Sequence, residues 1–322
     1  AYMRVLQPEP GTNKVSWIGN LKKYHLVDGV LRLSESTTSS PVLNSDGRFA
    51  GPSDMWSDTT GDGEKVTLGG AYAQVPLPFK NTTLNKETQL RRIFSDISVS
   101  NNTIVSQSND SSQGSESLLK IVSRADSDIT NASFVLNQFK SQDTLKFASN
   151  RVKRSLLNYL GYSLEINDLD LPETLDSPIE PQNAMGGIIH SLPLQLTYEG
   201  DLDEEGILGN TRKQYTLFGT MEGGLRLVDA ANGVEQMTFV PSEILLSTTA
   251  QIALKPEQSN ATGLAHGVDA PWVADARYEA KATTVSEKTT TAMTASRMNV
   301  YGGLRMGGES YYGLDFLNPK DA

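Results

Sequence analysis

The alternation of apolar and polar residues in the second half of the chain predicts a series of short β-strands. From residue 194 onward, runs rich in Leu, Val, Tyr and Thr are separated by tight turns that contain glycine. The four expected strands are Leu194–Tyr198, Gln214–Gly219, Leu225–Asp229 and Val234–Val240. Four antiparallel strands in succession form the unit of a β-propeller blade, and the acidic segment Glu199–Leu208 would be its long connection.

A second group of strands is predicted nearer the N-terminus. Their ranges are Lys14–Ile18, Tyr24–Val27, Val30–Leu33 and Val66–Ala71. Asp28-Gly29 is typical of a two-residue hairpin turn between the second and third of these strands. Gly19 and Asn20 interrupt the strand pattern, which predicts a bulge or a tight turn at this point.

One amphipathic helix is predicted over Thr144–Leu160. Apolar residues recur at every fourth position from Ala148 to Leu160, and Gly161 is placed to end the helix. We interpret the polar segment 95–117 as a surface loop and the acidic segment 164–183 as a linker. A basic cluster on or near the other face of the helix is interpreted as solvated; its members are Lys146, Arg151, Lys153 and Arg154.

The composition limits the partners and the chemistry of the chain. The 322 residues include 38 acidic and 28 basic ones, a net charge of −10, so we expect no nucleic-acid partner. Cysteine is absent, which excludes disulfides, zinc–thiolate sites and thiol nucleophiles. No apolar run approaches the roughly 20 residues of a membrane-spanning helix. The sequence begins with Ala1 and shows no signal peptide, so we expect a processed product or a piece of a longer protein.

No combination of residues in the sequence is typical of an active site. The histidines at 25, 190 and 266 are far apart, and the motifs of zinc proteases, serine hydrolases, P-loops and dinucleotide-binding folds are missing. His190 precedes a predicted strand, where a single histidine more often forms a packing hydrogen bond than acts as a base. We therefore expect a protein without catalytic residues and without a cofactor of its own.

Calcium is the one metal ion that the sequence makes worth considering. Asp58, Asp62 and Glu64 place oxygen atoms at alternating positions, as a calcium-binding loop does. The glutamate that closes such a loop is missing, because Gly69 occupies the twelfth position. We interpret the three acids as solvated turn residues and expect no micromolar calcium binding, with these residues as the weak candidates for ligands.

A faint internal repeat links two glycine-rich segments. Gly219–Gly224 is echoed by Gly303–Gly308, and each is followed by a strand that ends in Leu-Asp or Val-Asp. The offset is about two simple blade repeats. The echo therefore indicates either two blades or one blade with a long insertion.

Short segments spread from residue 15 to 319 resemble, in their order and spacing, one protein family. The first is Trp17–Tyr24, of the form W-x-G-N-L-K-K-Y. The others are Asp54–Trp56 with Val66–Gly70, Arg91–Phe94, Leu156–Gly161, Gly187–Pro193, Phe218–Leu225, Asp229–Glu235, Phe239–Pro241, His266–Asp269, and Gly303–Gly308 with Tyr311–Asp315. Together they are similar to the C-terminal β-propeller region of the PilC/PilY-like tip proteins of bacterial type IV pili. The chain departs from the family where Gly187 replaces Asp, Met221-Glu222 replaces Asn-Asp and Arg226 replaces His.

The resemblance implies a fold and a function. The fold would be all-β and mainly antiparallel, a modified β-propeller that is incomplete in this chain, with a helical insertion near 144–161. Residues 1–185 would form its first part, with loop and helical insertions, and residues 186–322 the following blades of one truncated domain. The function would be that of a non-enzymatic cell-surface adhesin and a pilus assembly and retraction factor. It would act in twitching motility, at the pilus tip and outer membrane of a Gram-negative bacterium.

The resemblance also implies partners. These are minor pilins, the pilus tip, a host or abiotic surface, and the remainder of the chain's own polypeptide. In the family, a von Willebrand A-like domain precedes this region and further blades with a calcium loop follow it, so calcium would bind outside this chain. A ring without those blades would leave open sheet edges, and we expect the chain to associate with the missing part.

Two other classes of function stay open from the residues. Asp229–Glu235 also resembles a blade motif of quinoprotein dehydrogenases. However, the tryptophan position of that motif falls at Thr238 or Phe239, and the chain has no vicinal cysteine pair. A carbohydrate-binding β module would present exposed aromatic side chains, and the sequence does not say whether its three tryptophans are exposed. A cofactor-binding assay tests the first alternative.

Overall fold

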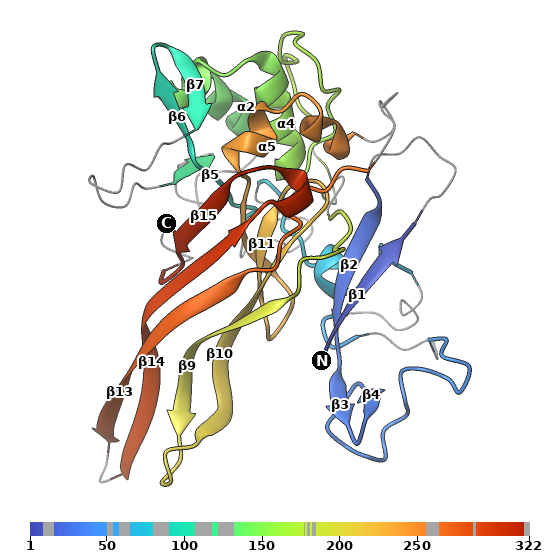
Figure 1. Ribbon diagram of the computed structural model, residues 1–322, viewed down its shortest axis with the longest axis vertical. Helices are drawn as coiled ribbons and strands as arrows, with labels where there is room; N and C mark the ends of the chain where they lie inside the picture. Colours follow the sequence, from blue (N-terminus) through green and yellow to red (C-terminus); the bar gives the residue numbers. More distant parts are fainter. Residues whose placement is uncertain are drawn as a thin grey trace.

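The computed structural model of the chain describes residues 1–8, 16–49, 54–57, 65–79, 90–106, 118–121, 132–176, 178, 181, 185–255, 264–285 and 288–318. The fold is mainly β, with 38% strand and 17% helix. Figure 1 shows most of the helices gathered at one end of the molecule and long β-hairpins extending toward the other. Within the described residues the strands form no closed propeller ring or barrel.

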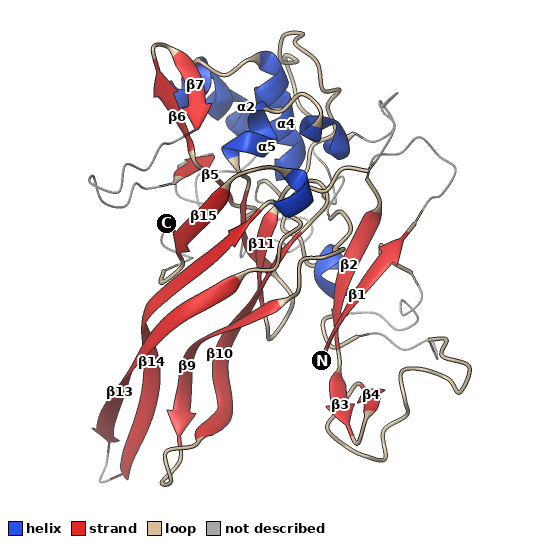
Figure 2. Ribbon diagram, in the orientation of Figure 1, coloured by secondary structure: helices blue, strands red, loops and turns tan. Residues whose placement is uncertain are grey.

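The largest sheet is mixed and has nine strands. Its strands are drawn in red in Figure 2. In sheet order the strands are β13 (Val273–Val285), β14 (Lys288–Gly303), β9 (Leu194–Leu202), β10 (Leu208–Gly219), β11 (Leu225–Asp229), β12 (Glu235–Phe239), β5 (Ile93–Ser95) and β8 (Leu119–Ile121). The ninth strand, β15 (Tyr311–Asp315), pairs with β14. The β12–β5 pair is parallel and the other pairs are antiparallel.

The predicted meander of four consecutive strands is confirmed in β9–β12, which pair antiparallel in chain order. The long acidic connection predicted over Glu199–Leu208 is wrong, because β9 and β10 extend into this segment and leave only a tight turn. In that turn the Asp203 carboxylate accepts a hydrogen bond from the Ile207 amide at 2.7 Å, and Gly206 takes a φ of +79°. Such a turn joins two strands directly, so the hairpin continues where the sequence predicted a loop.

Asn20 explains two differences in the N-terminal part. β1 (Tyr2–Gln7) and β2 (Ile18–Lys23) pair without a register shift, so the predicted bulge at Gly19 and Asn20 is wrong. The fully buried Asn20 amide instead donates to the carbonyls of Val66 and Gly69, at 2.8 and 2.9 Å. Its Oδ1 accepts from the Tyr72 amide at 2.9 Å. These bonds hold a turn and a short helix, α1 (Gly70–Ala73), where the sequence predicted a strand.

Other short elements follow or correct the predicted pattern. β3 (His25–Val27) and β4 (Val30–Arg32) form the predicted hairpin, with Asp28 and Gly29 at φ +50° and +76°. Part of the predicted surface loop 95–117 forms a hairpin of β6 (Ile97–Ser100) and β7 (Thr103–Ser106). Residues 107–117 of that prediction lie outside the described residues.

The predicted helix Thr144–Leu160 is divided into α3 (Asp143–Lys146) and α4 (Asn150–Leu160). Ser149 starts α4 as its N-cap, since its hydroxyl accepts a hydrogen bond from the Val152 amide. Gly161, at φ +112°, ends it as predicted. Two further helices, α2 (Ala132–Ser141) and α5 (Ser242–Leu246), were not predicted.

The interpretation of the basic cluster as a solvated face is wrong for Arg154. Its side chain is buried, and its guanidinium donates to the backbone carbonyls of Glu165, Leu169 and Asp170. Arg151 likewise donates to the carbonyls of Ile166 and Thr248. The segment predicted as a linker is therefore fastened to α4 by arginine side chains.

The central strands are buried on both faces. Leu217 and Leu227 pack into the larger hydrophobic core together with α2 and α4. Phe218 and Val228, which point to the opposite face of the same two strands, pack into a second cluster with Trp56 and with residues of β2 and α1. This double burial is why the second half of the chain contains near-continuous apolar runs.

Candidate functional site

Several segments that are far apart in sequence meet at one place, which we call the glycine junction. Gly19 of β2 lies against Gly187, so closely that a Cβ atom on Gly19 would be 2.5 Å from the Gly187 Cα. The Gly187 amide donates to the carbonyl of Trp17 at 2.8 Å, and its carbonyl accepts from the Met221 amide at 2.9 Å. Main chain therefore packs directly on main chain, which only glycine permits here.

The junction continues through a loop around Gly267. The Val268 amide donates to the carbonyl of Thr220 at 3.1 Å, and a Cβ on Gly267 would lie 2.2 Å from that same oxygen. A Cβ on Gly307 would lie 1.7 Å from the carbonyl oxygen of Gly267. The two echoed segments, which include Thr220 and Gly307, thus pack on one shared loop.

Beside the junction lies a buried cluster of four charged side chains: Arg91, Glu222, Arg226 and Glu235. Their side chains are between 1% and 4% exposed. Arg226 donates to Glu222 Oε1 through Nη2 at 2.6 Å and through Nε at 3.1 Å, and it donates to Glu235 through Nη1. Arg91 Nε donates to the other oxygen of Glu235 at 3.0 Å. Two positive and two negative groups therefore compensate one another away from water.

The pKa shifts in the cluster follow from burial and from these neighbours. Burial alone would raise the pKa of Glu235, but the positive charges of Arg91 and Arg226 outweigh it and leave the pKa below its ordinary value. Burial would lower the pKa of Arg226, yet Glu222 and Glu235 raise it. Glu235 and Arg226 are thus held in their charged forms, which suits a structural role.

Glu222 connects the charged cluster to the junction. Its Oε2 accepts a hydrogen bond from the Gly186 amide at 2.8 Å, and its Oε1 accepts another from the Thr220 hydroxyl at 2.7 Å. Its carbonyl accepts a bond from the hydroxyl of Tyr159 in α4, whose pKa is raised well above the ordinary value by burial. Both carboxylate oxygens are occupied, so Glu222 is poorly placed to act as a general base.

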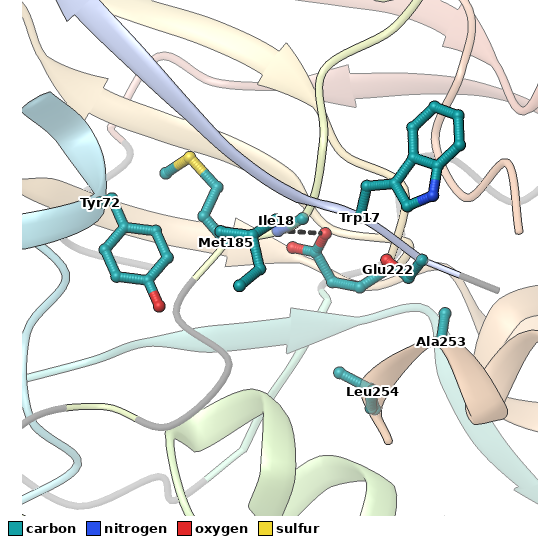
Figure 3. Close-up of a pocket in the computed structure, with 9 residues that line it drawn as sticks. Trp17, Ile18, Tyr72, Met185, Glu222, Ala253 and Leu254 are labelled. Atoms are coloured by element: carbon teal, nitrogen blue, oxygen red, sulfur yellow. Dashed lines mark hydrogen bonds between the residues drawn. The ribbon is translucent and has the colours of Figure 1, made fainter. Parts of the chain in front are cut away.

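A small pocket opens between the start of β2 and the end of the 3-10 helix η3 (Ala250–Leu254). Figure 3 shows Ile18, Met185 and Tyr72 along it, with the Glu222 carboxylate hydrogen-bonded at its wall. Its volume is about 50 Å³. Pockets for organic ligands occupy roughly 300 Å³ or more, and one water needs roughly 10–15 Å³, so this pocket has room for a few waters.

Among the described residues, those singled out in the sequence do not come together in one site. Asp58, Asp62 and Glu64 lie outside the described residues. His190 is hydrogen-bonded, with Nδ1 at 2.9 Å from both carboxylate oxygens of the buried Asp269, to which Arg305 also donates at 2.7 Å.

Of the other two histidines, His25 lies in β3 and His266 lies in the loop just before Gly267. Among the described residues there is no group of three side chains that could hold a metal ion. No helix in this part of the chain is long and apolar enough to cross a membrane.

Sequence reasoning missed the charged cluster. One signal was available in Arg226, a charged residue inside the apolar run of β11, because such a residue requires a buried partner. The partners themselves come from separate segments and could not be paired from spacing. No family model matches the sequence, and comparisons with curated proteins and with solved structures find no match either.

Proposed function

We propose that the chain is part of a non-enzymatic adhesin and assembly factor at the tip of a type IV pilus, of the PilC/PilY-like kind. The observation that carries this proposal is the glycine junction. Gly19, Gly187, Thr220, Gly267 and Gly307 belong to five different segments of the resemblance, and the fold brings them into backbone contact. Chance matches would not be expected to converge in this way, so the contacts support a shared structural unit.

We also propose that β9–β12 correspond to one blade of the family's modified propeller. Support comes from the antiparallel meander and from the sheet edges: among the described residues, β13 and β8 each pair on one side only. Such edges are where further strands of the same polypeptide would continue the sheet. At the pilus tip of a Gram-negative bacterium, the partners of the chain would be the remainder of its own polypeptide and minor pilins.

The quinoprotein alternative gains no comparable support. Its blades would have to enclose a multi-ring cofactor, whereas the pocket at the junction has a volume of about 50 Å³. The nearby carboxylate, Glu222, already accepts bonds from Gly186, Thr220 and Arg226. A binding role is therefore favoured over a redox one.

The test is deletion of the gene in the bacterium that carries it. We expect fewer surface pili by electron microscopy and smaller twitching zones, both restored by the wild-type gene. Immunogold labelling of an epitope-tagged chain should mark pilus tips, and minor pilins should copurify with it. Normal piliation and normal twitching in the deletion strain would refute the proposal, as would label confined to the cell interior.

A further inference from the structure

A surface with exposed tyrosines lies on the outer face of β13, β14 and β15. The pairing places Val273, Tyr301 and Gly313 in one row across the three strands, and Gly303 and Tyr311 in the next. The exposed fractions are 89% for Tyr311, 62% for Val273 and 44% for Tyr301. We call these five residues the tyrosine platform.

The opposite face of the same strands belongs to the core. Met298, Val300 and Leu314 alternate with the platform residues and are buried. Since successive side chains of a strand point to opposite faces, the platform must face outward. Single exposed apolar residues are ordinary on a protein surface, but three adjacent ones on two neighbouring rows are less so.

Glycines leave room for the two tyrosine rings. A Cβ on Gly313 would lie 3.0 Å from Tyr301 Cε1, and a Cβ on Gly303 would lie 3.1 Å from Tyr311 Cδ1. Each ring therefore leans toward a glycine on the neighbouring strand, where no side chain covers it. The backbone pairing of β14 with β15 places each tyrosine directly opposite its glycine.

A polar row borders the platform. Asp275, Asn299 and Asp315 pair across β13, β14 and β15, one row away from Tyr301 and on the same outward face. Asp275 is 2.6 Å from the guanidinium of Arg297, and the Asn299 amide is 3.5 Å from the Tyr301 hydroxyl. The surface thus combines apolar ring faces with carboxylate and amide groups that can hydrogen-bond to hydroxyls.

We propose that the tyrosine platform binds a neutral glycan chain, laid along its surface. A sugar ring presents a face of C–H groups that packs on an aromatic ring, and hydroxyls at its edge that suit the carboxylates and amide of the polar row. The net charge of −10 disfavours acidic sugars, and the Asp315 carboxylate in that row adds to this effect, whereas Asp275 is ion-paired with Arg297. The inference rests on the proposed adhesive function for its biological role, while the binding itself is a property of these strands.

The same features argue against a protein partner at this face. A stable protein interface buries roughly 800 Å² on each side around an apolar centre, far more than three apolar side chains provide. The tryptophans considered in the sequence do not supply more, since Trp56 and Trp272 are buried and the half-buried Trp17 lines the pocket beside β2. A small surface with two exposed tyrosines suits a thin chain of sugar rings.

The test is binding of the purified chain to immobilised oligosaccharides, measured by biolayer interferometry. The neutral probes are chitohexaose, cellohexaose and mannohexaose, and the acidic probe is an oligomer of sialic acid. We expect saturable binding to at least one neutral probe, with each of Tyr301→Ala and Tyr311→Ala weakening it about three- to tenfold. Tyr311→Phe, which keeps the ring, should bind within about threefold of the wild type.

Tyr278→Ala is the matched control. Tyr278 is 40% exposed in β13, the strand that carries Val273, and it pairs with Ala295 on the face that continues the core. This variant should bind like the wild type. Equal melting temperatures of all the variants would show that a loss of binding is not a loss of folding.

Three outcomes would overturn the inference: no binding to any neutral probe, binding that survives the double variant Tyr301→Ala/Tyr311→Ala, or binding to the acidic probe alone. Any of these, with pili lost in the deletion strain, would leave the proposed function standing. Normal piliation together with tyrosine-dependent glycan binding would refute the pilus assignment and keep the platform.

Discussion

Replacing Arg226 with methionine should strongly destabilise the fold. The arginine donates three hydrogen bonds to two buried carboxylates, those of Glu222 and Glu235. Methionine fills a similar volume but donates nothing, so the two carboxylates would be left with only Arg91 as a positive partner. The substitution thus creates an uncompensated buried negative charge without leaving a large cavity.

The expected cost is about 3–5 kcal/mol in the free energy of unfolding, the usual range for breaking a buried ion pair. Each hydrogen bond to a charged group contributes roughly 1.5–3 kcal/mol, so the loss of three points to the upper end of that range. In a thermal melt this corresponds to a fall of roughly 5–15 °C in the melting temperature. The matched control is Lys213→Met, whose cation lies 3.7 Å from Glu199 on an exposed part of β10, and it should cost at most ~1 kcal/mol.

The pH dependence gives a sharper test than the size of the loss. In the wild type the pKa of Glu235 is lowered, so its contribution to stability is present above about pH 4.3 and is lost as the pH falls through the folded-state pKa. In the variant, burial without Arg226 should raise the pKa of the carboxylates, which then bind protons more tightly in the folded state.

Urea titrations at pH 7 and near pH 5 should therefore show a smaller deficit for the variant at the lower pH. A loss below ~1 kcal/mol, or a deficit that grows on acidification, would refute the reasoning.

Three further predictions concern other parts of the chain. Burial raises the pKa of Tyr215 to about 12, so stability should fall as the pH rises from about 10 toward 12, which alkaline melts with tyrosine absorbance would detect. Gly19→Val should prevent stable folding because its side chain would meet the backbone of Gly187, whereas Gly209→Ala, whose Cβ would lie 3.2 Å from its nearest neighbour, should fold; circular dichroism and melting distinguish the two. Added calcium should leave the melting temperature unchanged at micromolar concentrations, and a calorimetric titration with saturable micromolar binding would contradict this.

Local structure was predictable where one or two residues determine the backbone conformation. Asp28-Gly29 forces a tight hairpin, and Gly161 ends α4, in both cases because the backbone turns through the left-handed region. β11 was predicted with its observed bounds because it is buried on both faces and flanked by turns. These signals lie within a few residues of the element that they define.

The long hairpin of β13 and β14 was missed for a physical reason. Its apolar side consists largely of alanine and threonine, so the hydrophobic alternation is weak. The alternation that does exist is in charge, with Asp275, Arg277, Glu279 and Lys281 at every second position, and this could have indicated a strand. The strand predicted over Val66–Ala71 was wrong because the long-range hydrogen bonds of Asn20 override the local preference for strand.

The glycine junction also determines how freely this sequence can change over generations. At Gly19, Gly267 and Gly307 the space for a side chain is already filled by backbone atoms, and at Gly187 it is filled by the side chains of Leu6 and Met221, so almost any replacement is excluded. Most of the long hairpins, by contrast, face solvent and tolerate substitution. Divergence should therefore erase similarity over most of the chain and leave short islands around fixed glycines, so the spacing of those islands carries more information about ancestry than overall identity does.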